Sequence, residues 1–204
     1  MKQLLLLLGL MMGCFGVNAQ AQPAYAYSTA ENNQLFQTLI THRDTAVINP
    51  VVRTIKADPN QFIPPVLFAL SNVLYERGEP ETGLYYFCLA QLRASYDANL
   101  AVDDLQRFTH KMVTIYETNF GHVFTQFATT HPRVFTTTIY RVLKFVKHHK
   151  GAYNHHWIYL DGVPTDRLKK LKQLTKPKSD WPEIKRMTIQ QYRDKILLSQ
   201  PRQH

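Results

Sequence analysis

Histidine side chains gather in one short stretch of the chain, and they are the first candidates for chemistry. Four of the nine histidines lie at positions 148, 149, 155 and 156. Neutral imidazole is a common metal ligand, and it also acts as a general base near neutral pH. We therefore consider His149, His155 and His156 as ligands of a zinc or copper ion. The same three residues are the candidates for a histidine-dependent hydrolase of envelope material, with or without a metal.

Two features of this stretch argue against a metal site. Adjacent residues point about 100° apart on a helix and to opposite faces on a strand, so each pair of neighbours offers one ligand to a common ion. The nearby Lys144, Lys147 and Lys150 would also repel a cation. In the alternative interpretation, one or two imidazoles bind the carbonyl end of the preceding helix and the others make polar contacts around Trp157.

Acidic residues offer a second, weaker possibility for catalysis. Asp97 together with Asp103 or Asp104 would supply the two carboxyl groups that glycan hydrolysis needs. Acidic residues near helix ends are more often caps, so we expect residues 96–99 to end a helix. The chain has no Gly-x-Ser-x-Gly, His-Glu-x-x-His or Cys-x-x-Cys motif and no glycine-rich phosphate loop. The sequence therefore predicts a binding protein without catalytic activity or cofactor.

Positive charge is concentrated in the C-terminal third, residues 133–204. That segment has sixteen Lys or Arg residues against five Asp or Glu, whereas residues 20–132 have seven against ten. Such an excess favours an acidic protein partner or an anionic envelope component. A solvated face that only keeps the protein soluble is the alternative. The residues we expect to contact a partner are Arg141, Lys144, Arg167, Lys169, Lys170 and Lys172.

The segment 165–174 combines this charge with three leucines at a spacing of three residues. Leu168, Leu171 and Leu174 would share one side of a short helix, and the lysines would surround the other side. Such a helix makes peripheral contact with a membrane or docks on a partner. Alternatively, the leucines pack on the protein's own core, which we favour.

The first residues have the order of a secretory signal peptide. Lys2 precedes an apolar run from Leu4, and small residues follow up to Ala19. We expect residues 1–19 to be removed by cleavage near Ala19 or Ala21, with lipid attachment at Cys14 as a minor alternative. The protein would then be periplasmic or secreted, without a transmembrane segment, and nucleic acid would be an improbable partner for its basic surface. Cys88 would be the only remaining cysteine, and its apolar surroundings predict a buried thiol.

The elements that must position these residues are helices. Apolar residues recur at helical spacing along residues 20–204, which predicts a single all-α domain of about six to eight helices. Ser28 and Glu31 have the capping-box spacing of a helix start. Residues 151–164 should form a loop with a short extended piece at 157–160. The helices are expected from residue 29, over 45–56, in a hairpin over 64–97, from 103, over 133–150, over 165–174 and over 180–198.

The hairpin resembles one tetratricopeptide or Sel1-type repeat. The similarity rests on small and apolar residues at the spacings with which such a repeat packs its two helices. These are Leu67, Leu70, Ser71, Leu74, Gly78, Gly83, Phe87 and Ala90. No second copy follows, and stacked repeats need about three units for a continuous core. The resemblance implies helix-on-helix packing and not a peptide-binding solenoid.

Two longer stretches resemble a group of small exported bacterial proteins of unassigned role. These stretches are 84–94 with 97–99, and 153–160. The resemblance implies a bacterial envelope location and supplies no active site. A toxin-neutralising immunity protein of the periplasm would be one specific case of such a protein, because immunity proteins are often small, compact and free of catalytic motifs.

Overall fold

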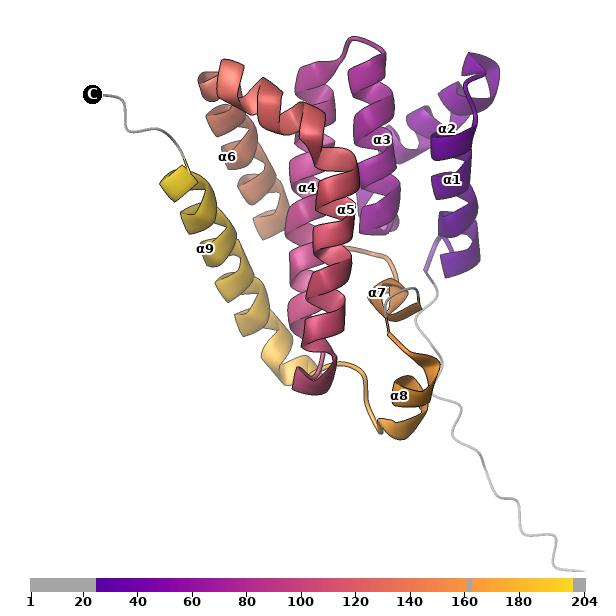
Figure 1. Cartoon of the computed structure of the whole chain (residues 1–204), viewed down its shortest axis with the longest axis vertical. Helices are drawn as coiled ribbons and strands as arrows, with labels where there is room; N and C mark the ends of the chain where they lie inside the picture. Colours follow the sequence, from indigo (N-terminus) through magenta and orange to yellow (C-terminus); the bar gives the residue numbers. More distant parts are fainter. Residues whose placement is uncertain (1–24, 161–162, 200–204) are drawn as a thin grey trace, which may run out of the picture.

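Helices make up the regular structure of the described part of the chain, which comprises residues 25–160 and 163–199 and contains no strand. In this computed structural model seven helices have at least 13 residues, within the predicted six to eight (Figure 1). The predicted all-α class is therefore confirmed. The helices are α1 (Thr29–Thr41), α2 (Thr45–Ala57), α3 (Pro64–Glu76), α4 (Pro80–Leu100), α5 (Asp103–Thr130), α6 (Pro132–His148), the short α7 (Trp157–Leu160) and α8 (Thr165–Lys170), and α9 (Trp181–Ser199).

Helix α4 is the centre of the molecule. It packs against α3, α5, α6, α7 and α9, and thirteen of its 21 residues are buried. Figure 1 shows α3 with α1 and α2 on one side of α4, and α6 with α9 on the other. A helix that is covered on most sides has no wide polar face. The charged residues in the covered part of α4, Arg93 and Asp97, must therefore find their partners inside the protein.

The predicted hairpin of residues 64–97 is present as α3 and α4, and α4 continues to Leu100. Gly78 occupies the turn with a φ of 77°, which glycine adopts without strain. At Gly83, a Cβ atom would lie 2.7 Å from the carbonyl oxygen of Ser71. The two helices are therefore in close contact along a line of small residues. Membership of a repeat family stays a prediction.

Local sequence signals at two other places are confirmed. The Ser28 hydroxyl accepts from the amide of Glu31, and the Glu31 carboxylate accepts from the amide of Ser28, so the capping box begins α1. Cys88 is buried at 1 % exposure, and burial raises the pKa of its thiol to about 12. Its thiol is thus an apolar core group, as its neighbours in the sequence predicted.

The expected extended piece at 157–160 is wrong, because these residues form the short helix α7. The Asn154 side chain accepts from the amide of His156, and its carbonyl accepts from the amide of Trp157. This turn starts α7 locally. The indole of Trp157 then fixes the turn to the core, where it donates to the carboxylate of Asp97. The sequence of residues 157–160 by itself does not indicate this contact with α4.

Helix α8 ends at Lys170, earlier than the predicted 174. The following residues instead pair with the α4–α5 connection, where the amide of Val102 donates to Leu174 and the amide of Lys176 donates to Leu100. Leu168, Leu171 and Leu174 are half-buried against the core. The leucines therefore pack on the protein itself, which is the alternative favoured above.

The predicted signal peptide and Cys14 lie outside the described residues. Within residues 25–160 and 163–199, no helix has the length and apolar character needed to cross a membrane.

Candidate functional site

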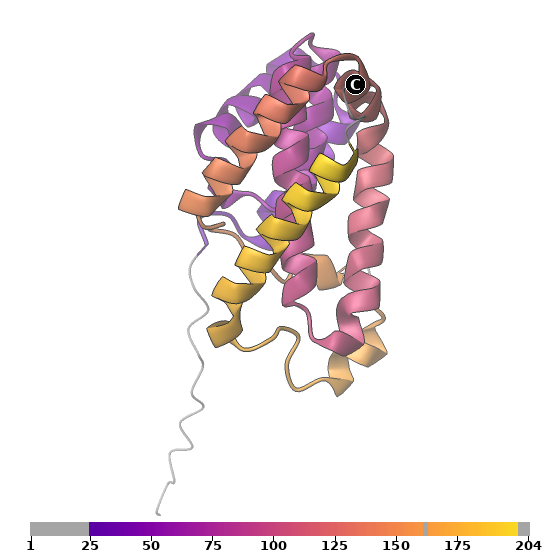
Figure 2. The same ribbon diagram turned by 90° about the vertical axis from the view of Figure 1, so that its left-hand side faces the viewer.

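A cavity of about 480 Å³ opens between α4, α6 and α9. In Figure 2, α6 and α9 lie in front of α4. The loop after α6 also contributes lining residues. Helix α4 contributes Leu92, Arg93 and Tyr96 to this wall, and α9 contributes residues from Trp181 to Ile189. This size is in the usual range for sites that bind small molecules.

Three lysines from three different segments line this cavity. Lys150 follows the end of α6, Lys178 precedes α9, and Lys185 lies on α9 itself. The buried Arg93 and the imidazoles of His149 and His155 are also lining residues. Among the described residues that line the cavity, none is Asp or Glu. The cavity therefore concentrates positive charge that its own wall does not neutralise.

The remaining wall is apolar and aromatic. Leu92, Val146 and Ile189 provide aliphatic surface, and Tyr96 and Trp181 provide ring surface. The ring of His155 lies 5.4 Å from that of Trp181, at 87° to it. An organic molecule that enters can thus bury a carbon skeleton while its charged end meets the lysines.

Asp97 lies directly behind this wall and is completely buried. Its carboxylate accepts hydrogen bonds from three side chains of the segment 153–157. The Tyr153 hydroxyl donates to both oxygens at 3.3 and 3.1 Å, Nδ1 of His155 donates to Oδ1 at 2.6 Å, and Nε1 of Trp157 donates to Oδ2 at 2.6 Å. Hydrogen bonds to an ionised acceptor are short and strong, so they can compensate a buried charge.

His155 connects this carboxylate to the cavity. Its side chain is 13 % exposed and lines the cavity, with Nδ1 bound to Asp97. Because an ionised carboxylate accepts the proton of Nδ1, the other ring nitrogen, Nε2, is left as the acceptor in the neutral ring. Nε2 has no hydrogen-bond partner among the described residues. The pair has the arrangement in which a carboxylate orients a histidine that acts on a bound molecule.

Arg93 is the second buried charge on α4, one helical turn before Asp97. Its guanidinium donates to the carbonyl of Pro59 at 2.7 Å and to the side chain of Asn60. The rings of Phe145 and Tyr153 lie within 6 Å of its central carbon, at 5.7 and 5.8 Å. Burial lowers the pKa of Arg93, and the nearby Tyr153 and Asp97 oppose this change. Arg93 thus fixes the segment that precedes α3 and balances the charge of Asp97.

Lys185 is held less tightly than Arg93. Its amine donates only to the carbonyl of His149, at 3.4 Å. Partial burial lowers the pKa of Lys185, and the positive charges of Lys150 and Arg93 add to this effect. A negatively charged ligand would relieve this repulsion, so Lys185 is placed to bind one.

The structure separates the three histidines that the sequence singled out. His155 and His149 both line the cavity, but Nδ1 of His149 binds the carbonyl of Phe145 at the end of α6. His156 is exposed and is not a lining residue, and its ring lies against Tyr159. Nowhere in the described ranges do three or more His, Cys, Asp or Glu side chains form a group that could hold a metal ion. The observed contacts match the alternative interpretation, with one imidazole at a helix end and another near Trp157.

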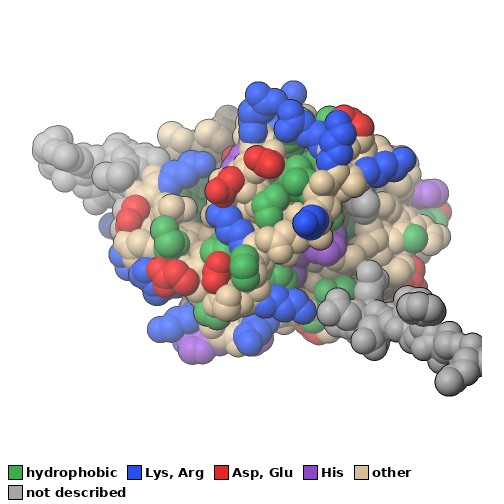
Figure 3. All heavy atoms as spheres, turned by 90° about the horizontal axis from the view of Figure 1, so that it is seen from below, with side chains coloured by type: hydrophobic (Ala, Val, Ile, Leu, Met, Phe, Trp, Pro, Cys, Tyr) green, Lys and Arg blue, Asp and Glu red, His purple; other side chains and the backbone are tan. Residues whose placement is uncertain are grey.

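The six predicted partner-binding cations fall into two groups. Arg141 and Lys144 are exposed on α6, where Arg141 lies over the ring of Tyr85. Arg167, Lys169, Lys170 and Lys172 are exposed on and just after α8, at the opposite end of the molecule (Figure 1). Seen from that end, Lys and Arg side chains are spread over the surface and mixed with acidic ones (Figure 3). The six residues therefore do not form one continuous patch.

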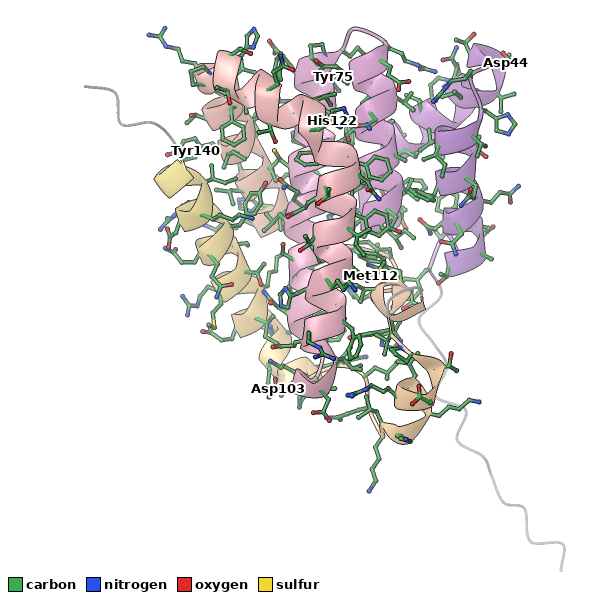
Figure 4. The ribbon with its side chains drawn as sticks, in the orientation of Figure 1. Asp44, Tyr75, Asp103, Met112, His122 and Tyr140 are labelled. Atoms are coloured by element: carbon green, nitrogen blue, oxygen red, sulfur yellow. The ribbon has the colours of Figure 1, made fainter. Side chains whose placement is uncertain are left out.

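The predicted carboxylate pair is not assembled. Asp97 is buried, whereas the side chain of Asp103 is 89 % exposed at the start of α5, where it pairs with Lys176 (Figure 4). Asp104 is also exposed. Asp97 therefore cannot act on a glycan together with Asp103 or Asp104 in this structure.

The sequence suggested Asp97 only as half of a carboxylate pair, and otherwise as part of a helix end, so the buried network around Asp97 was not predicted. A signal was nevertheless present. Arg93 and Asp97 are the only charged residues between Leu84 and Leu100, a stretch that is otherwise apolar or uncharged, and they are four residues apart on one helix face. Opposite charges inside an apolar helix indicate a buried polar network.

Comparison of the chain with protein-family models, with curated protein sequences and with solved structures finds no significant match.

Proposed function

We propose that this protein binds a small organic anion in the cavity between α4, α6 and α9. The observation that carries the proposal is the lining itself, which includes Lys150, Lys178 and Lys185 and, among the described residues, no Asp or Glu. Uncompensated cations inside a partly enclosed site attract an anion more strongly than cations on an open surface, because less water screens them. The aliphatic and aromatic walls favour a ligand with a carbon skeleton over a bare inorganic ion.

Titration with phenyl phosphate, followed by calorimetry, tests this proposal. We expect binding of phenyl phosphate and no measurable binding of phenol, which has the same ring without the charge. Lys185→Met should weaken binding at least about tenfold, because a hydrogen bond to a charged group contributes about 1.5–3 kcal/mol.

Lys144→Met is the matched control, since Lys144 is exposed on α6 and does not line the cavity. Equal affinities for phenyl phosphate and phenol would contradict the proposal. Equal effects of the Lys185 and Lys144 substitutions would contradict it as well, because they would show that only the overall charge matters.

A second candidate is binding of an acidic protein partner by the exposed lysines near α8. Because Leu168 and Leu171 pack on the core, the side chains of Lys169, Lys170 and Lys172 remain exposed to solvent. Export to the periplasm and a toxin-neutralising role belong to this candidate as proposals. Mass spectrometry of the protein isolated from envelope extract checks the proposed export, since cleavage near Ala19 or Ala21 predicts the mass of the mature chain.

Binding of the partner should depend on salt and on these three lysines together. A purified acidic partner that binds the wild type and the triple alanine variant equally well at low salt would remove this candidate. Binding of phenyl phosphate should be the same in both proteins, which separates the α8 surface from the cavity.

A further inference from the structure

We propose that the cavity also hydrolyses the anion it binds, with His155 as the general base and a phosphodiester as the reacting group. This inference rests on the proposed function, because the lysines that hold the anion would hold the reacting phosphoryl group itself. Lysine binds phosphate as a point charge from several directions, whereas the fork of Arg93 is already occupied by Pro59 and Asn60.

The argument starts from the hydrogen bond between His155 and Asp97. A completely buried carboxylate at 2.6 Å from Nδ1 fixes both the ring orientation and the tautomer of His155. The contacts of Tyr153 and Trp157 fix the carboxylate in turn, so none of these groups must reorganise during a reaction. Because His155 lines the cavity and its Nδ1 binds Asp97, Nε2 is the ring nitrogen that remains to take a proton from a bound water molecule.

Positive charge lines the same cavity as His155. Lys185 and Lys150 are both lining residues, and they would stabilise negative charge on the oxygens of a bound phosphoryl group. Lys185 is the better proton donor of the two, since burial and the neighbouring cations lower its pKa. Base and acid thus lie on different walls, the loop after α6 and helix α9.

The reaction consumes one water molecule. Nε2 of His155 takes a proton from the water as its oxygen bonds to phosphorus, and the bond from phosphorus to the leaving oxygen breaks. The leaving oxygen takes a proton from the ammonium group of Lys185. One phosphodiester and one water give one phosphomonoester and one alcohol. Proton exchange with solvent then returns His155 to its neutral form and Lys185 to its charged form.

Bis(p-nitrophenyl) phosphate is the probe, and release of p-nitrophenolate is the readout. We expect turnover by the wild-type protein. His155→Asn should reduce the rate constant at least about 100-fold, in the range lost with a general base. Its amide can still donate to Asp97, but it has no atom in place of Nε2. His156→Asn is the matched control, because His156 is the adjacent residue and lies outside the cavity.

Asp97 would be a positioning residue, and its test is the separation of kcat from KM. In Asp97→Asn the ring of His155 loses the carboxylate that fixes its tautomer, so kcat should fall while KM for the diester stays near that of wild type. A loss of folded protein alone would reduce the rate for every substrate concentration in the same proportion and would also reduce the binding capacity for phenyl phosphate. If Asp97→Asn does not fold, the His155 variant still decides.

The outcomes separate the two proposals. A wild-type protein that binds phenyl phosphate and leaves the diester intact overturns the hydrolysis proposal and leaves the binding proposal standing. Equal turnover by the wild type and His155→Asn also overturns it. Failure to bind phenyl phosphate overturns the binding proposal, and the hydrolysis proposal with it.

Discussion

Two hollows in the described part of the chain have nearly equal volumes and opposite chemistry. The cavity between α4, α6 and α9 has about 480 Å³, and a groove between α1, α3 and α5 has about 440 Å³. Among the described residues that line the groove, the charged ones are Arg43 and Glu76, which pair with each other at 3.8 Å. The rest of the groove is mainly apolar and aromatic, with Met112 of α5 among its residues (Figure 4).

This comparison shows that volume alone does not identify a site. The groove is internally balanced, so a charged ligand gains nothing there. The cavity has several cations without a carboxylate in its wall, and burial together with two of these charges lowers the pKa of Lys185. Behind its wall lies Asp97, which accepts hydrogen bonds from three side chains. The groove between α1, α3 and α5 differs from the cavity because its two charged residues pair with each other.

The largest difference between the two regions should appear when their carboxylates are removed. Asp97→Ala leaves three buried donors without an acceptor and Arg93 without its counter-charge. We expect a loss of about 3–5 kcal/mol in the free energy of unfolding, as when one partner of a buried charge pair is removed. Urea denaturation measures this loss.

The matched change in the groove is Glu76→Ala. The Arg43–Glu76 pair is 71 % and 60 % exposed, and such pairs contribute little. The free energy of unfolding should stay within about 0.5 kcal/mol of wild type. Similar losses for both variants would mean that Asp97 is not the organising charge of its region.

A smaller effect is expected from added volume in the cavity wall. Gly151 lies so close to Tyr153 that a Cβ atom would collide with the tyrosine ring. Gly151→Ala should therefore displace a ring that binds Asp97, at a cost of about 1–3 kcal/mol. Thermal denaturation measures the cost, and binding of phenyl phosphate should weaken as well.

Lys150→Ala is the control at the adjacent position. It removes a cation of the cavity without crowding Tyr153, so affinity should fall while the melting temperature stays near that of wild type. An unchanged melting temperature and an unchanged affinity for phenyl phosphate in Gly151→Ala would contradict this prediction. They would show that the loop 149–156 can make room for the added methyl group.

The groove should tolerate a change that makes it more apolar. Oδ1 of Asn72, a groove residue, is buried and has no hydrogen-bond partner among the described residues. Asn72→Leu removes this unsatisfied acceptor, and we expect a gain of about 1 kcal/mol in the free energy of unfolding. Anion binding in the other hollow should be unchanged. Asn119→Leu, at an exposed position of the same groove, should give no gain.

The smallest expected effect is a pH dependence from Lys185. Its pKa lies below the usual 10.5 in the folded protein, because burial and the charges of Lys150 and Arg93 disfavour the ammonium form. The unfolded chain therefore binds more protons as the pH rises from the folded pKa toward 10.5, so stability increases over that interval.

Comparison with Lys185→Met isolates this contribution from the tyrosines, which titrate in the same range. The wild type should gain under about 1 kcal/mol relative to the variant between pH 7 and pH 10.5, because solvent screens a partly exposed group. A wild type that loses stability relative to the variant would contradict the direction of the shift.

The helical class could be predicted because it depends on local patterns. Apolar spacing, the capping box at Ser28 and the turn at Gly78 act within a few residues, and each is found where the sequence placed it. The cavity could not be predicted in the same way. Asp97 and His155 are 58 residues apart in the sequence, and only the packing of the loop 149–156 on α4 brings them together.

Contacts between residues far apart in the sequence also explain the two wrong predictions in the segment 157–174. The residues around Trp157 predict a strand, but the hydrogen bond from its indole to Asp97 holds this segment as the short helix α7. The end of α8 is determined by pairing with Leu100 and Val102, which lie far away in the sequence. The excess of positive charge in residues 133–204 is visible in the sequence. The sequence does not show that Lys150, Lys178 and Lys185 line one cavity, or that the cations of α6 and α8 lie apart.

The order of these residues along the chain has a consequence for folding. The donors to Asp97 among the described residues precede residue 158, whereas α9, which completes the cavity, begins at Trp181. The chain can therefore supply hydrogen bonds to its buried carboxylate before the segment with Lys178 and Lys185 packs against α4. The most repulsive part of the protein is then the last to assemble, on a scaffold whose internal charges are already satisfied.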